Sequence, residues 1–308
     1  MIGVDSARKD RDKIADWSNR MISPAAPYQN MMTVDVEDYF QVEAFFRVID
    51  RKDWSSYPCR VEQNTDQILS MLQSADAKAT FFTLGWVAKR YPALVRRIVE
   101  SGHEVASHGL EHRRADSQSR GEFLADLEDS KSLLEDVSGV AINGYRAASF
   151  SITRKNLWAL DTIAEAGYKY SSSIYPIRHD HYGIPQAPRF AFMPFAKSTF
   201  LEIPITSFKI GKTNLPCGGG GFFRLLPYLW SSFQLRSIRA SNLGPCMFYF
   251  HPWEIDPGQP RVRNAPLVSR FRHYTKLSSM QGRLNRLLRD FPWQRIDKVY
   301  PICSGAEQ

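Results

Sequence analysis

Short apolar or β-branched segments alternate with longer amphipathic segments along most of this chain. Residues 78–84, 103–107 and 245–250 have the pattern of buried strands, and Pro92 begins a helical pattern that Gly102 ends. Alternation of this kind, repeated roughly every 25 to 40 residues, is typical of a mostly parallel α/β sheet or barrel. A chain of 308 residues with 43% hydrophobic content can bury a large core around such a sheet.

Polar side chains suited to catalysis or metal binding stand at or just after the ends of several predicted strands. They are Asp35, His108, Arg146 and His251. In parallel α/β folds the carboxyl ends of the strands meet on one face, where active sites are built. The sequence therefore predicts one site on that face to which distant parts of the chain contribute.

Three carboxylates stand within four positions at the end of the strand that begins at Met31: Asp35, Glu37 and Asp38. Like charges this close raise one another's pKa, so the cluster is costly unless a cation or a catalytic task stabilises it. The alternative is a solvated acidic turn, which is as common. Imidazoles elsewhere in the chain favour the cation.

His108 and His112 are four residues apart. On a helical turn this spacing puts both imidazoles on one face, where they can share a cation. Such pairs also occur by chance, so the pair alone does not establish a site. With one carboxylate added, the set suits zinc or another divalent ion and leaves coordination positions for water and substrate.

Two further features exclude other kinds of site. The four cysteines are widely spaced without a CxxC motif, which indicates neither a disulfide framework nor a thiolate metal site. The glycine run at residues 218–221 lacks the GxGxxG spacing of a nucleotide site. We interpret it as a loop that allows close backbone approach, followed by a helix at residues 225–239.

The chain resembles the NodB-type polysaccharide deacetylases, carbohydrate esterase family 4. Four motifs occur in the family's order, and the resemblance covers about residues 31–295: Thr33–Asp38, Ser107–His112, Gly144–Phe150 and Phe248–Glu254. Within the family the chain is most similar to the deacetylases of exosortase and PEP-CTERM exopolysaccharide gene clusters. That closer similarity rests on the Asp35–Phe40 motif, residues 218–227, the His251–Pro257 motif and Arg272–Tyr274. The resemblance implies a distorted (β/α) barrel of NodB type, with a helical, basic C-terminal extension.

The resemblance also implies catalytic roles. Asp35 matches the general base, Arg146 the arginine that orients it, and His251 the general acid. A backbone N–H near Phe150 is expected to stabilise the oxyanion. The family's fourth motif normally supplies an aspartate, and Ser171 occupies that position here, so the partner of Arg146 or His251 stays open.

The implied cofactor is one divalent metal ion, with zinc as the expected ion. His108 and His112 match the metal histidines. The carboxylate ligand is Glu37 or Asp38, because the adjacent aspartates of the common family form are absent. Glu37 fits an Asp-x-acid spacing, whereas Asp38 keeps the residue type, and we favour Asp38 slightly.

The expected reaction is therefore metal-dependent removal of N-acetyl groups from an N-acetylhexosamine-containing polysaccharide or oligosaccharide. The expected partner is this glycan and not nucleic acid. One alternative is hydrolysis of a cyclic amide or amidine, as some relatives of the fold perform. Another is a carbohydrate-binding protein with a decayed site, for which Ser171 in place of an aspartate is the support.

The expected organisation is a flexible leader at residues 1–30, a deacetylase domain at 31–260 and a basic extension at 261–308 packed on the barrel. No apolar run is long enough to span a bilayer, and the N-terminus lacks the apolar core of a signal peptide. We therefore expect a cytoplasmic protein without a transmembrane segment.

Residues 261–298 of the extension contain ten Arg or Lys and two acidic residues, so their charge of +8 equals that of the whole chain. Such a segment favours weak contact with an anionic glycan or with a membrane surface, the latter as peripheral association. The alternative is a basic helical face docked on an acidic part of the same protein.

Overall fold

The computed structural model describes residues 14–25, 29–241 and 244–304. Its centre is an eight-stranded sheet in the order β10-β1-β2-β3-β4-β5-β6, with β9 also paired to β1. All its pairs of neighbouring strands are parallel. The strands are β1 (Asn30–Val36), β2 (Thr80–Thr83), β3 (Glu104–Ser107), β4 (Gly144–Tyr145), β5 (Tyr170–Ser171), β6 (Leu201–Glu202), β9 (Met247–Phe250) and β10 (Trp293–Gln294). A separate antiparallel hairpin consists of β7 (Ser207–Ile210) and β8 (Thr213–Pro216).

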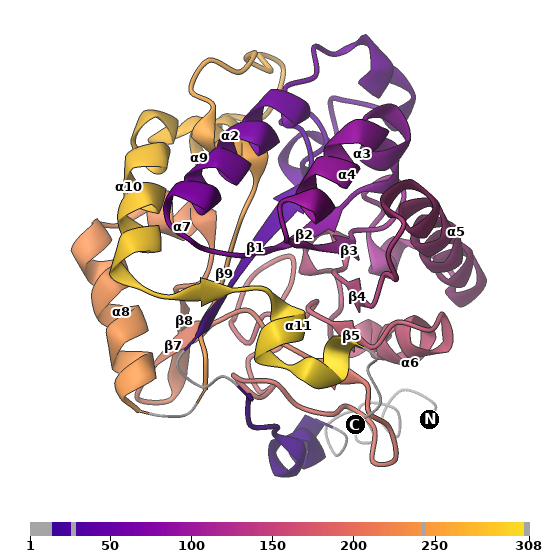
Figure 1. The fold of residues 1–308 in the computed structure, drawn as a ribbon, viewed down its shortest axis with the longest axis vertical. Coiled ribbons are helices and arrows are strands. Elements are labelled where there is room, and N and C mark those ends of the chain that lie inside the picture. The colour runs from indigo at the N-terminus through magenta and orange to yellow at the C-terminus, as the bar shows by residue number, and fades with distance from the viewer. Residues whose placement is uncertain (1–13, 26–28, 242–243, 305–308) are drawn as a thin grey trace.

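Helices surround the sheet on the outside (Figure 1). They are α2 (Val61–Ser74), α3 (Gly85–Arg90), α4 (Pro92–Glu100), α5 (Arg120–Ser138), α6 (Trp158–Glu165), α7 (Gly220–Leu225), α8 (Tyr228–Ala240), α9 (Leu267–Tyr274), α10 (Leu277–Asp290) and α11 (Ile296–Val299). This half-barrel of parallel strands covered by helices confirms the predicted fold class.

Local sequence explains the main elements. All seven residues of β1 are buried, as expected for a central strand that is covered on both faces. Ser119 and Glu122 form a capping box at the start of α5, and Gly139 ends that helix with a φ of 71°. Pro92 stands in the first turn of α4, and the apolar residues Leu94, Val95 and Ile98 of this helix are buried.

The N-terminal segment differs from the expected flexible leader where the structure describes it. Ile14 and Trp17 are buried, and the Trp17 ring lies 4.8 Å from that of Phe192. Met21 forms an isolated bridge with Phe192. The segment at 14–25 is therefore packed on the domain, because Ile14 and Trp17 are buried in the main core. Residues 1–13 and 26–28 lie outside the described residues.

The glycine run also differs from expectation. Gly220 and Gly221 already belong to α7, and the second helix begins at Tyr228 rather than Leu225. The expected close approach of the backbone is present, because a Cβ on Gly218 would lie 2.5 Å from the carbonyl oxygen of Met247.

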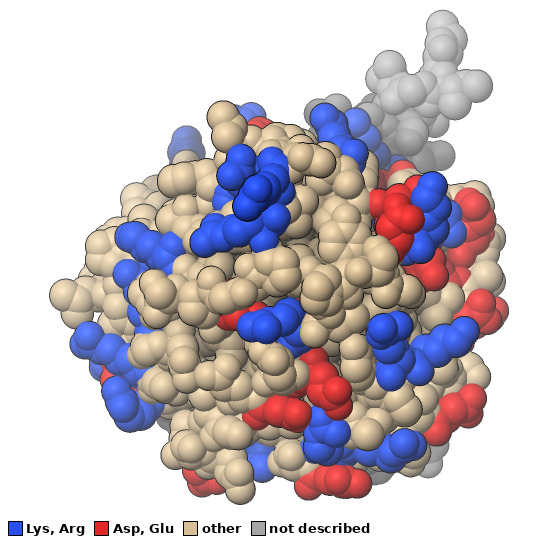
Figure 2. All heavy atoms as spheres, turned by 90° about the horizontal axis from the view of Figure 1, so that it is seen from above, with Lys and Arg blue, Asp and Glu red and all other residues tan. Residues whose placement is uncertain are grey.

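The C-terminal extension is helical, as expected, and it also contributes to the sheet. β10 pairs with β1, and the buried side chains of α10 join the main core: Met280, Leu284, Leu287 and Leu288. Figure 2 shows the basic side chains of one face in several separate groups, with acidic ones gathered mainly along one side. Within the part of the chain that the structure describes, no helix is long and apolar enough to cross a membrane.

One half-buried arginine of the extension is docked against the end of α7. Arg283 Nη1 donates to the carbonyl oxygens of Phe223, Arg224 and Leu226 at 2.7, 3.0 and 2.7 Å. These carbonyls end α7, so the guanidinium satisfies acceptors that the helix leaves open.

We expect Arg283→Ala to lower the free energy of unfolding by about 1–3 kcal/mol, because several charge-assisted hydrogen bonds are lost. Chemical denaturation measures the effect. Arg289→Ala is the matched control, since Arg289 is exposed on the same helix. Equal stability of the two variants would contradict the docking role.

Candidate active site

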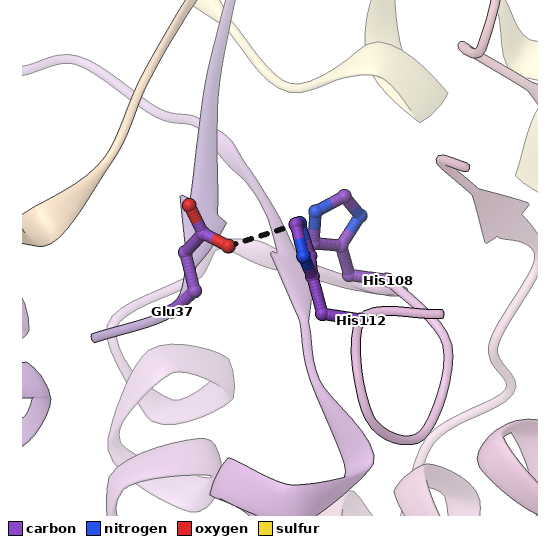
Figure 3. A group of neighbouring side chains, drawn as sticks. All are labelled: Glu37, His108 and His112. Carbon is purple, nitrogen blue, oxygen red and sulfur yellow. Dashed lines mark ion pairs between the residues drawn. The ribbon is translucent and has the colours of Figure 1, made fainter. Parts of the chain in front are cut away.

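Three buried side chains that can bind a metal converge at the carboxyl ends of β1 and β3. Glu37, His108 and His112 each offer one ligand atom, and these atoms all lie within 4.8 Å of one another. Figure 3 shows the Glu37 carboxylate facing the His112 ring, with the His108 ring beside it, and Glu37 Oε2 lies 3.0 Å from His112 Nε2. One carboxylate and two imidazoles form a donor set that suits a divalent ion such as zinc.

The two imidazoles do not lie on a helical turn, contrary to the expectation from their spacing. Residues 108–112 form an irregular loop after β3, in which Gly109 and His112 have positive φ of 79° and 51°. These left-handed residues curl the loop, so that the ring centroids are 5.1 Å apart. A non-glycine residue in this conformation is uncommon and often marks a functional site.

Burial keeps both histidines in the neutral form. His108 Nδ1–H donates to the carbonyl oxygen of Arg146 at 2.8 Å, which leaves Nε2 free to bind a cation. Burial lowers the pKa of His108 to about 4 and that of His112 well below its usual value. Neutral imidazole is the form that binds metals, so both rings fit the role.

Glu37 is buried without the hydrogen bonds that a carboxylate needs. Its Oε2 makes no hydrogen bond among the described residues, although it lies 3.0 Å from His112 Nε2. Its Oε1 accepts a long bond of 3.4 Å from Trp253 Nε1–H and lies 3.4 Å from His251 Nε2. Burial raises the pKa of Glu37 to about 7, although His251 opposes the shift. A cation here would restore the ionised form, so the cradle fits a metal ion.

Asp38 has a different task in the structure. Its Oδ1 accepts from the backbone N–H of Tyr39 at 2.8 Å, and its Oδ2 accepts from those of Arg60 and Val61 at 2.6 and 2.8 Å. The carboxylate thereby satisfies N–H groups at the start of α2. It is not part of the converging ligand set, so the geometry favours Glu37 over Asp38.

We expect Asp38→Ala to keep the metal and to lower the free energy of unfolding by about 1–3 kcal/mol, since it leaves buried N–H groups unsatisfied. Glu37→Gln should instead lose the metal and remain folded. Metal analysis and denaturation of both variants test this. A folded Asp38→Ala variant without metal would make Asp38 the ligand.

Asp35 and Arg146 form a buried ion pair beside the metal-binding group. Arg146 Nη1 lies 2.5 Å from Asp35 Oδ1, and neither side chain is more than 3% exposed. Arg146 Nη2 also donates to Ser172 Oγ at 3.0 Å, and its guanidinium stacks over the Phe82 ring at 4.0 Å. The arginine therefore fixes the direction of the Asp35 carboxylate.

The predicted fourth motif does not supply a carboxylate to this pair. Ser171 lies in β5, and its hydroxyl donates to Ser173 Oγ at 2.7 Å. The neighbouring Ser172 contacts Arg146 through both its carbonyl and its hydroxyl. Phe150, whose N–H we expected at the oxyanion, donates that N–H to the Ala147 carbonyl at 3.1 Å.

His251 faces Asp35 and Glu37 through one ring nitrogen and Glu254 through the other. Its Nε2 is 3.4 Å from Glu37 Oε1 and 3.9 Å from Asp35 Oδ2, and its Nδ1 is 2.9 Å from Glu254 Oε1. Although burial lowers the pKa of His251, Glu37 and Glu254 together raise it to about 9. The ring is therefore a proton donor directed at the site.

Sequence reasoning missed Glu254 and its partner Arg224, whose Nε donates to Glu254 Oε2 at 2.7 Å. The only local signal was the spacing of three residues between His251 and Glu254. Trp253 and Tyr39 stand next to site residues and could stack on sugar rings if exposed, but they are 7% and 0% exposed and pack in the protein instead.

Two family models match this chain. Residues 53–171 match the family model described as polysaccharide deacetylase, and residues 172–301 match a model described as a domain of unknown function, DUF3473. A peptidoglycan-N-acetylglucosamine deacetylase of Bacillus cereus is 30% identical over 105 residues, which are 34% of this chain and 38% of that protein. A chitooligosaccharide deacetylase of Sinorhizobium fredii is 46% identical over 48 residues, 16% of this chain and 22% of the relative.

The chain spans about a third of the length of the curated relatives it matches first. A solved structure from Mycobacterium smegmatis, assigned to the polysaccharide deacetylases, superimposes with a TM-score of 0.52 at 17% identity. That superposition covers 87% of this chain and 94% of the other, and it supports the fold. Residues 53–171 of the chain therefore match the polysaccharide deacetylase family, and the solved structure supports the same fold for the whole domain.

Proposed function

We propose that the protein is a metal-dependent hydrolase that removes N-acetyl groups from an N-acetylhexosamine-containing polysaccharide. The observation that carries the proposal is the convergence of a Glu37–His108–His112 ligand set with Asp35 and His251 on one buried face. Amide hydrolysis needs a base for the attacking water, an acid for the leaving amine and a positive charge at the developing oxyanion. This face holds groups suited to each of these tasks.

Glu37, His108 and His112 would hold one divalent ion, and we propose zinc because of the two nitrogen donors and one oxygen donor. A bound ion of this kind polarises the amide carbonyl and lowers the pKa of water. Support comes from the buried Glu37 carboxylate, whose Oε2 faces His112 at 3.0 Å and makes no hydrogen bond among the described residues, and from the neutral imidazoles.

Asp35 then takes the proton of the attacking water, and Arg146 keeps its carboxylate in place. The pair is buried, so the carboxylate has few alternative orientations. His251 donates its Nε2 proton to the nitrogen of the leaving amino sugar as the C–N bond breaks. Each positioned proton transfer of this kind contributes about 10²–10⁴-fold to the rate.

An exopolysaccharide is the proposed natural substrate, and the resemblance to exosortase-associated deacetylases is its support. The alternative reactions are less well supported. A cyclic amide or amidine hydrolase without metal has no use for the converged histidine pair. A decayed binding protein would not need a base, an acid and an open ligand set within one group.

Acetate release from a panel of N-acetylated oligosaccharides tests the proposal. We expect turnover by the purified protein, loss of turnover after chelation and recovery on addition of zinc. Ring opening of cyclic amides without acetate release would favour the cyclic amide hydrolase. Binding of the oligosaccharides without any turnover, in protein loaded with metal, would favour the decayed binding protein.

We further propose weak peripheral contact with an anionic membrane surface through α9. Leu267, Val268 and Phe271 are 77%, 62% and 63% exposed on one side of this helix, and Arg272 is exposed beside them. Apolar and basic groups together suit the boundary of an anionic bilayer. Salt-sensitive flotation with anionic vesicles, weakened in Leu267→Ser/Phe271→Ser, is the expected result. Binding to an acidic glycan but not to vesicles would show that the partner of α9 is the glycan. In that case we propose a cytoplasmic protein without membrane association.

A further inference from the structure

We propose that Glu254, held by Arg224, is the positioning residue for His251 and takes the place of a carboxylate from the fourth motif. The inference rests on the proposed function, since it gives the His251 side chain its direction in that reaction. It also gives a task to the C-terminal half of the chain, for which the matching family model records no function.

The contacts of Glu254 fix both its own carboxylate and the imidazole. Its Oε1 accepts from His251 Nδ1–H at 2.9 Å and from the His251 backbone N–H at 3.1 Å, and its Oε2 accepts from Arg224 Nε at 2.7 Å. Glu254 and Arg224 are 1% and 2% exposed. Because Nδ1 is occupied, the ring presents Nε2 to Asp35 and Glu37.

Arg224 is itself anchored by the backbone. Its Nη1 donates to the carbonyl oxygens of His273 and Thr275 at 3.0 and 2.6 Å, and its Nη2 donates to that of Arg272 at 3.2 Å. These carbonyls stand at the end of α9, so the guanidinium ties α7 to the connection between α9 and α10. An ion pair held in this way has little freedom to turn away from Glu254.

Gly220 leaves room for the Glu254 carboxylate, and Trp253 stacks on the imidazole that this carboxylate contacts. A Cβ on Gly220 would lie 2.3 Å from Glu254 Oε1, so only glycine allows the carboxylate to approach α7. The indole of Trp253 stacks between two imidazoles, with its centroid 5.1 Å from that of His251 and 4.1 Å from that of His273. Stacking on Trp253 keeps the His251 ring parallel to the indole, and the hydrogen bond to Glu254 keeps Nδ1 on the side away from Asp35 and Glu37.

Only the Nε2 proton of His251 is transferred, and the Nδ1 proton stays hydrogen-bonded to Glu254. The Nε2 proton passes to the nitrogen of the amino sugar as its bond to the acetyl carbon breaks, and Glu254 remains a carboxylate. Arg224, Glu254, Gly220 and the stacked His273 all lie within residues 172–301. The C-terminal half thus serves as the support of the acid, whereas the first half supplies the base and the metal-binding group.

The test compares two acetyl substrates that differ in their need for an acid. An N-acetylated chitooligosaccharide has an amine leaving group that must be protonated, whereas a nitrophenyl acetate has a leaving group that departs without a proton. We expect Glu254→Gln to lower kcat for the amide by on the order of 10²-fold with little change in KM, and to lower ester hydrolysis by only a few-fold. Arg224→Met should lower the amide-to-ester ratio in the same direction.

Glu104→Gln is the matched control, because it replaces another buried carboxyl group, at β3, which accepts hydrogen bonds from Thr80 and Tyr170. It should leave the amide-to-ester ratio unchanged. Parallel loss of both activities in Glu254→Gln, or loss of neither, would overturn the positioning role.

A second measurement does not depend on turnover. In ¹⁵N-labelled protein the Nδ1–H proton of His251 should give a downfield signal, absent in His251→Gln, that disappears in Glu254→Gln and persists in Glu104→Gln. Absence of that signal from the wild type would also overturn the inference. A wild type that shows the signal but releases no acetate would reject the proposed function and leave the Glu254 contact standing.

Discussion

Replacing His108 or His112 by alanine is expected to remove the bound divalent ion and to reduce acetate release to background. Each imidazole is one of only three donors in the converged set, and each is buried and neutral. Two donors of a three-donor site bind a divalent ion far more weakly, and the group that polarises the carbonyl is then missing. Metal analysis after dialysis, together with the acetate assay, measures both effects.

His103→Ala is the control for loss of a buried histidine. The ring of His103 accepts from the Ala79 backbone N–H at 3.2 Å, at the start of β3 rather than at its end. We expect this variant to be destabilised and to keep its metal. Stoichiometric metal in a His108→Ala/His112→Ala double variant would reject the ligand assignment.

The fold could be predicted because its signals are local. Apolar strands and amphipathic helices alternate in the sequence, and burial of the apolar face leaves few other arrangements. Two parts of the fold depend on distant contacts that no local pattern reports. β10 has two residues and exists through its pairing with β1, and Trp17 is buried through its contact with Phe192.

The candidate site was predictable to a similar degree. Asp35, His108, Arg146 and His251 meet because the carboxyl ends of parallel strands meet, which the alternation already implied. Glu37 directly follows β1, and its N–H donates to the Asp35 carbonyl at 3.0 Å in a tight turn that no local pattern reports. The Asp-x-acid spacing favoured Glu37 as the ligand, whereas the preference for Asp38 rested on residue type alone.

Such arguments could not identify Arg224 as part of the site. It is 30 residues from Glu254 in the sequence, and its remaining partners are backbone carbonyls near residue 273, which any sequence provides. A buried arginine can be recognised as part of the site only when the fold brings its partner to the same place.

Asp35→Asn is expected to keep the fold and the metal and to lose turnover by on the order of 10²-fold or more. The amide is nearly isosteric with the carboxylate and can still accept a hydrogen bond from Arg146, which lies 2.5 Å away in the wild type. It cannot take a proton from water, so the step that depends on a base fails while binding is preserved. The kcat of acetate release, the KM and the metal content of the variant measure the three properties separately.

Arg146→Lys separates orientation from proton transfer. Lysine keeps the positive charge beside Asp35 but cannot contact Asp35, Thr33 and Ser172 together, as the guanidinium does. We expect this variant to lose less turnover than Asp35→Asn and to keep its metal. Loss of metal in Asp35→Asn would instead make Asp35 a ligand, because removal of a base alone leaves the Glu37–His108–His112 set unchanged.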